Sequence, residues 1–157
     1  MRGTFCRFVR PAALQGSVSS WAQAVHGITE RQLRGEAVFS SVFKDFLDFL
    51  DSTMWPTFSH VVVVAHNGSR FDFPVLLSDM RESFGDETGF PSNWLLLDSL
   101  TFVSRLRLPG LDKGLSLEAL HSQLCPDHMW NQSHRADDDD EALHRVLEQA
   151  LLRAGMS

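Results

Sequence analysis

The pattern of hydrophobic positions predicts two short strands in the middle of this chain. Val61–Ala65 is an uninterrupted and mostly β-branched run, and Trp94–Asp98 is a second apolar run. Runs of this kind are typical of strands that are buried on both faces of a parallel sheet. A further short strand is expected at Thr4–Val9, where Pro11 would end it.

Helical periodicity is clearest in two longer segments. Large apolar side chains recur at helical spacing over Ala37–Leu50, and Ala136–Ala154 carries a similar apolar stripe. Shorter helices are expected after a Thr29–Gln32 capping-box pattern, at Asp72–Pro74, between Asp98 and about Leu106, and after a capping Ser116. Strands that alternate with helices indicate an α/β sandwich.

The composition fits one soluble globular domain over residues 1–157, with 43% hydrophobic and 22% charged residues. The longest aliphatic run is far shorter than the about 20 residues that cross a bilayer, and no signal peptide is apparent, so no membrane contact is expected. Cys6 and Cys125 have neither a metal-binding spacing nor a disulfide framework. An intracellular setting, in the nucleus or the cytoplasm, is therefore expected.

The net charge of −6 argues against a protein that grips duplex DNA by its overall charge. Nucleic acid would then enter a local site, such as one bridged by metal ions. The alternative is that the acidity serves solubility alone.

Two polar segments are candidates for chemistry. Ala65–Pro74 follows the first central strand and contains His66, Asn67 and Asp72 at a strand end, where sites form in α/β sheets. His134–Asp140 leads into the last helix and contains four consecutive aspartates. Phosphodiester hydrolysis with two divalent ions needs carboxylates from different elements, together with a histidine that accepts the proton of the attacking water.

Each segment also has a purely structural interpretation. Carboxylates in a first helical turn interact favourably with the helix dipole, although four adjacent charges repel one another. His66 and Asn67 could equally form an ordinary turn at the end of a strand. Neither segment alone decides between the two interpretations.

Together and in this order, the two segments resemble the motifs of DEDDh-type (DnaQ-like) 3′→5′ exonucleases of the three-prime repair exonuclease kind. AHNGSRFDFPVL (Ala65–Leu76) is similar to their second motif, and HRADDDDEAL (His134–Leu143) is similar to their third, H-x4-D. The stretches HGIT, LLLDSL and GLSLEALHSQL match the intervening parts, so the resemblance covers about Phe5–Leu152. Phe5–Pro11 and the helix after Ala37 also resemble the exonuclease-like region of promyelocytic leukaemia protein relatives.

The resemblance implies a ribonuclease H-like exonuclease fold and a hydrolase that cleaves phosphodiester bonds at nucleic-acid 3′ ends with two Mg²⁺ or Mn²⁺ ions. It implies that Asp72 and Asp139 are metal ligands and that His134 is the general base. The substrate would be single-stranded, with DNA favoured over RNA. The residues implied to bind the nucleotide are His66, Asn67, Phe71, Ile28 and Thr29.

One departure from the family pattern concerns the first motif. The family opens with a strand that bears D-x-E, followed by a second strand, and no D-x-E occurs before Thr29. We therefore expect an N-terminally incomplete fold that lacks the first two strands, impaired activity, and self-association through an unpaired strand edge. The alternatives are a catalytically inactive nucleic-acid-binding module and a protein-interaction module of exonuclease descent.

Overall fold

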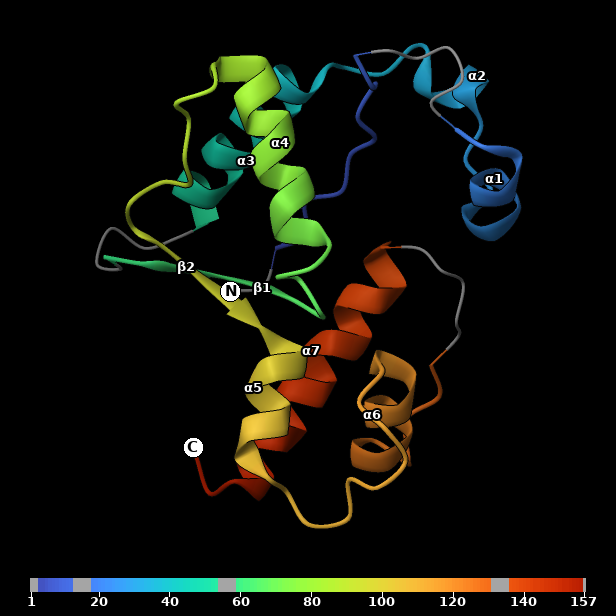
Figure 1. Cartoon of the computed structure of the whole chain (residues 1–157), viewed down its shortest axis with the longest axis vertical. Coiled ribbons are helices and arrows are strands. Elements are labelled where there is room, and N and C mark those ends of the chain that lie inside the picture. The colour runs from blue at the N-terminus through green and yellow to red at the C-terminus, as the bar shows by residue number, and fades with distance from the viewer. Residues whose placement is uncertain (1–2, 13–17, 54–58, 131–135, 157) are drawn as a thin grey trace. The chain divides into compact units, whose positions relative to one another are not determined.

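The computed structural model describes residues 3–12, 18–53, 59–130 and 136–156, and helices alternate there with two strands (Figure 1). The order is α1 (Ser20–His26), α2 (Glu30–Leu33), α3 (Phe39–Thr53), β1 (Val61–Ala65), α4 (Asp72–Phe84), β2 (Trp94–Asp98), α5 (Ser99–Leu106), α6 (Leu117–Leu124) and α7 (Ala136–Arg153). The strands β1 and β2 pair in a small parallel sheet. This mixed α/β organisation is compatible with the expected ribonuclease H-like fold.

The chain divides into two compact units. Unit 1 comprises Met1–Val61 and Leu76–Trp94, and unit 2 comprises Val62–Val75 and Leu95–Ser157. The organisation as a single exonuclease-like domain stays a prediction. Each unit has a core of its own kind.

Aromatic rings form the core of unit 1. Phe43 is 8% exposed, and its ring centroid lies 5.4–6.4 Å from four other rings. These four belong to Phe39, Phe46, Phe84 and Trp94. The apolar face that the sequence predicts for the first long helix is therefore the face of α3 that carries these contacts.

The strand predicted at Thr4–Val9 is wrong. The described part of this segment has no regular secondary structure, and one isolated parallel bridge joins Arg10 to Val38. The reason is side-chain packing, because the ring of Phe5 lies 5.5 Å from that of Phe46 and 5.6 Å from that of Phe49. Ring contacts with α3 thus hold the segment instead of a strand ladder.

Aliphatic side chains on helices form the core of unit 2. Helix α7 packs between α5 and α6 (Figure 1). Its start at Ala136 and the start of α6 after a capping Ser116 are as predicted, and the Ser116 hydroxyl accepts a hydrogen bond from the Ala119 amide at 3.2 Å. The buried residues are Val103, Leu108, Leu120, Leu124, Cys125, Val146 and Ala150.

The strands match their predicted ranges but not their predicted burial. Val62 in β1 is 55% exposed and Leu95 in β2 is 52% exposed, so neither is covered on both faces as expected. The physical reason is that the sheet has two strands within the described residues. The pattern of β-branched residues predicts the strand correctly and overstates what packs on it.

The remaining predictions concern helix α1, the cysteines and membrane contact. Helix α1 was not predicted, because this short segment is exposed and has no apolar face, with Trp21 at 75% exposure. Cys6 and Cys125 are both free thiols, which agrees with the lack of a disulfide framework. Among the described residues, no helix is both long and apolar enough to cross a membrane.

Candidate active site

A tight turn follows β1 and determines where α4 begins. Asn67 adopts a left-handed conformation with φ of 56°, which asparagine tolerates better than most residues. At Gly68 a Cβ atom would lie 2.7 Å from the Cβ of Ala65, so the turn has no room for a side chain there. The Phe73 amide donates to the Gly68 carbonyl at 2.9 Å. The turn therefore fixes Asp72 at the first residue of α4.

His66 is held in place by a buried serine. Its Nδ1 lies 2.9 Å from the hydroxyl of Ser99, which is fully buried. Burial lowers the pKa of His66, and this effect outweighs the backbone of Leu115 and the charges of Asp98 and Asp72, which raise it. Among the described residues the buried Nε2 has no well-formed hydrogen bond. His66 is therefore a neutral, anchored imidazole near neutral pH.

Asp98 links the turn to α5. Its carboxylate accepts hydrogen bonds from the Leu100 amide at 3.1 Å and from the Ser69 amide at 3.2 Å. Partial burial acts to raise the pKa of Asp98, but the hydrogen bonds from Ser69, Thr101 and Leu100 outweigh it and lower the pKa. Asp98 and Ser99 are positioning residues that the sequence analysis missed. The signal was an Asp-Ser pair directly after a strand, which is typical of a helix cap.

A cavity of about 390 Å³ in unit 2 brings several predicted site residues together. Asp72 from α4, Asp139 from α7 and His66 from the turn all contribute to its wall. The full lining is Val64, Ala65, His66, Asp72, Leu117, Asp139, Asp140 and Leu143. The cavity therefore combines carboxylates from two helices with a neutral imidazole and aliphatic side chains.

The orientation of Asp139 follows from the packing of α7. Ala142, Val146 and Ala150 are at most 1% exposed and form a stripe at a spacing of four residues. Asp139 and Leu143 are also four residues apart, and both line the cavity. A rigid, well-packed helix therefore holds this carboxylate.

The other predicted site residues lie elsewhere or outside the described residues. Asn67 and Phe71 are not part of the cavity lining, and Phe71 is 62% exposed. Ile28 and Thr29 belong to unit 1, where Thr29 caps α2 with the predicted capping box. His134 lies outside the described residues. Their functional roles stay predictions.

Metal binding can be tested against the donor atoms of the cavity. Among the described residues, no group of three or more His, Cys, Asp or Glu side chains is arranged to hold a metal ion. Mg²⁺ nevertheless binds commonly through one or two carboxylates, with waters and substrate phosphates as its remaining ligands. Asp72 and Asp139 fit that requirement, because both present oxygen ligands to the same cavity.

Comparison with known proteins agrees with this chemistry. Residues 3–147 match the sequence model of a family described as Exonuclease. The chain is also 27% identical over 159 residues to the Arabidopsis thaliana protein named exonuclease DPD1, chloroplastic/mitochondrial. That alignment covers 98% of this chain and 48% of the relative, so the chain spans about half the length of the curated relative it matches. Because the family model covers most of its residues, the chain belongs to the exonuclease family.

Proposed function

We propose that this chain is a DEDDh-type nuclease domain that binds the 3′ end of single-stranded nucleic acid, DNA in preference to RNA, at the cavity of Asp72 and Asp139. The observation that carries the proposal is that carboxylates from α4 and α7, far apart in the sequence, line one cavity together with His66. Membership of the exonuclease family supplies the reaction class. The domain would act in an intracellular setting.

Asp72 and Asp139 are the proposed ligands of a Mg²⁺ or Mn²⁺ ion. When bound, such an ion offsets negative charge on the phosphate and lowers the pKa of a coordinated water. His134 is the proposed general base, which takes the proton of the attacking water. This assignment rests on the spacing of His134 and Asp139, which follows the third motif of the family.

The nucleotide is proposed to lie across the turn after β1. His66 would contact it as a neutral ring, and Asn67 lies in the same turn. The exposed Phe71 ring offers a face on which a base can stack, a contact worth about 1–3 kcal/mol per base. Ile28 and Thr29 are proposed to approach the terminal base.

The second candidate function is a nucleic-acid-binding module without catalytic activity. It is favoured by the lack of a group of three metal ligands among the described residues, since two-ion hydrolysis needs several carboxylates. The 157 residues on their own are therefore expected to bind one ion weakly and to shorten oligonucleotides at the background rate.

Manganese binding tests the site without relying on activity. We would titrate Mn²⁺ into the 157-residue chain in the presence of a deoxynucleoside 5′-monophosphate and follow the free ion by electron paramagnetic resonance. Asp72→Asn and Asp139→Asn should each abolish binding. Asp138→Asn is the matched control, because Asp138 belongs to the same aspartate run but does not line the cavity. Equal binding by all four proteins would contradict the proposed site.

Assays on 3′-labelled single strands then separate the two candidates. Binding of DNA without shortening would favour the inactive module. Robust Mg²⁺-dependent shortening that Asp139→Asn abolishes would show a competent exonuclease in these 157 residues. Absence of both metal and oligonucleotide binding would leave only a protein-interaction role.

A further inference from the structure

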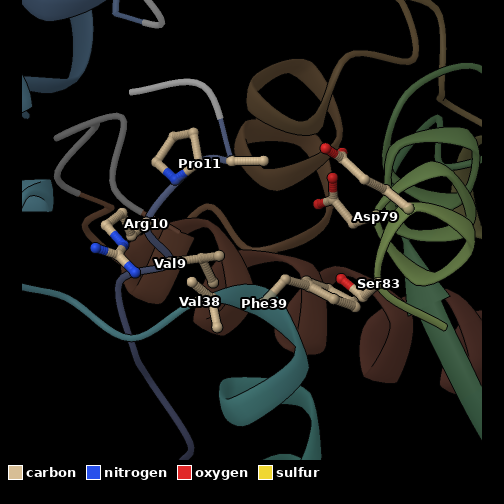
Figure 2. Close-up of a pocket in the computed structure, with 9 residues that line it drawn as sticks. Val9, Arg10, Pro11, Val38, Phe39, Asp79 and Ser83 are labelled. Carbon is tan, nitrogen blue, oxygen red and sulfur yellow. The ribbon is translucent and has the colours of Figure 1, made fainter. Parts of the chain in front are cut away.

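Unit 1 contains a cavity of about 420 Å³ that the proposed nuclease function does not use. Three segments surround it: the irregular N-terminal segment, the start of α3 and one side of α4 (Figure 2). Its lining residues are Val9, Arg10, Pro11, Ala12, Val38, Phe39, Asp79, Glu82 and Ser83. The side formed by α4 is acidic, Arg10 lies on the opposite side, and apolar side chains lie between them (Figure 2).

The walls of this cavity are fixed by contacts within unit 1. The Arg10 amide donates to the Ala37 carbonyl at 2.8 Å, which ties the N-terminal segment to the start of α3. Phe39 stacks on Phe43 at a centroid distance of 5.4 Å and lies 6.3 Å from Phe84 of α4. The cavity is therefore formed before any ligand enters it.

The acidic side has a charge that nothing nearby compensates. Asp79 and Glu82 are three residues apart on α4, so their side chains point to the same side of the helix. Partial burial, and then repulsion from Glu82, raise the pKa of Asp79. Among the described residues, no cationic side chain forms an ion pair with either carboxylate. A partly buried carboxylate without a counter-charge is unfavourable, so a cation that entered the cavity would be stabilised.

The shape and chemistry of the walls narrow the choice of cation. Phe39 and Val38 offer an apolar surface for a hydrocarbon stem, which a bare metal ion lacks. Two carboxylates one helical turn apart suit the planar fork of a guanidinium, which forms paired hydrogen bonds with carboxylates. Arg10 on the opposite side disfavours a polycation, and the carboxylates disfavour a nucleic-acid phosphate.

We propose that this cavity binds a single arginine side chain of a partner polypeptide. The guanidinium lies against Asp79 and Glu82, and the aliphatic stem packs on Phe39 and Val38. The cavity is large enough for this side chain, because ligand pockets start at roughly 300 Å³. Binding here is a protein-recognition function of unit 1, separate from the carboxylates of unit 2.

Calorimetric titration of the 157-residue chain with a blocked Gly-Arg-Gly peptide tests the proposal. The same peptide with citrulline keeps the shape of arginine but not its charge, and it should bind at least about tenfold more weakly. Asp79→Asn and Glu82→Gln should each weaken the arginine peptide by a similar factor. Asp86→Asn is the matched control, because Asp86 is exposed in the same unit and does not line the cavity, and it should leave binding unchanged.

Two further measurements keep the result decisive. Asp79→Asn should melt at the same temperature as the unmodified chain or slightly higher at neutral pH, because it removes a repelled carboxylate, so weaker binding cannot come from unfolding. Agmatine and spermine distinguish a free amine from a peptide. Tighter binding of either amine than of the arginine peptide, or equal binding of the citrulline peptide, would overturn the proposal.

Discussion

The two units solve the problem of holding polar groups in different ways. In unit 1, tilted aromatic rings with centroids 5.4–6.4 Å apart hold an irregular segment onto α3. In unit 2, aliphatic side chains at most 2% exposed, such as Leu120 and Val146, lock three helices together. Both units carry carboxylates at a cavity, but only those of unit 2 lie on a turn and helices fixed by buried hydrogen bonds.

The difference matches the demands of the two proposed sites. Metal ligands tolerate small errors in position poorly, so Asp139 benefits from the rigid packing of α7. A pocket for one flexible side chain tolerates more variation, and aromatic rings supply large contact area without requiring regular structure. We expect changes in the two cores to have distinguishable effects.

The largest expected effect comes from the centre of the aromatic core. Phe43→Ala removes a ring that contacts four others, and it should destabilise the protein by about 3–5 kcal/mol. Phe43→Leu keeps most of the volume and should cost clearly less. Hydrogen exchange would show protection lost first in α3, while α6 and α7 stay protected longer. Simultaneous loss across α3 and α7 would mean that the two units unfold as one.

A smaller effect is expected at the turn that positions Asp72. Gly68→Ala places a Cβ 2.7 Å from that of Ala65 and 2.9 Å from the ring of Phe73, and such overpacking costs about 1–3 kcal/mol. Gly89→Ala is the matched control in unit 1, where the new Cβ meets no described atom within 4 Å. Thermal melts of the two variants check this. A Gly68→Ala protein as stable as Gly89→Ala would show that the turn can move.

The sequence predicted most of the helices and strands because their signals are local. The capping box at Thr29, the cap at Ser116 and the β-branched run of β1 each depend on neighbouring residues. The wrong strand at Thr4–Val9 depended on its surroundings instead. An apolar alternation cannot reveal that Phe5 will pack on helix α3.

The candidate site was predictable to the extent that motifs carry it. Asp72, Asp139 and His66 line one cavity, as their places in two family-like motifs implied. Ser99 and Asp98 were not recognised as positioning residues, because hydrogen bonds such as His66 to Ser99 join residues distant in the sequence. The cavity of unit 1 was missed for the same reason, since its wall combines three separate segments.

Helix caps should give the next smaller effect and repeat the comparison on a local scale. Ser116→Ala should cost about 1 kcal/mol, because α6 contributes Leu120 and Leu124 to the core of unit 2. Thr29→Ala should cost less overall, because α2 buries only Leu33 and can fray without exposing a core. Urea melts of both variants, with Thr29→Ser as the conservative control, measure the difference. A larger loss for Thr29→Ala would show that α2 supports more of unit 1 than its burial suggests.

The smallest expected effect is a difference in the sign of the pH response. His121 in unit 2 is 4% exposed, and its Nε2 lies 3.1 Å from Nδ1 of His128. Burial, followed by the charges of His128 and Arg145, lowers the pKa of His121 from its ordinary 6.5. The unfolded state then binds the proton more readily, so this contribution to stability is complete above pH 6.5 and is lost as the pH falls below it.

Asp79 in unit 1 has the opposite sign. Its pKa is raised above 3.8, so the folded state binds the proton more readily and acidification toward that range stabilises unit 1. Between pH 7 and 5, hydrogen exchange should therefore show α6 and α7 losing protection while α3 does not. His121→Gln should reduce the loss in unit 2, whereas His144→Gln, at an exposed position on α7, should leave it unchanged. Equal acid sensitivity in the two histidine variants would rule out His121 as the origin of the response.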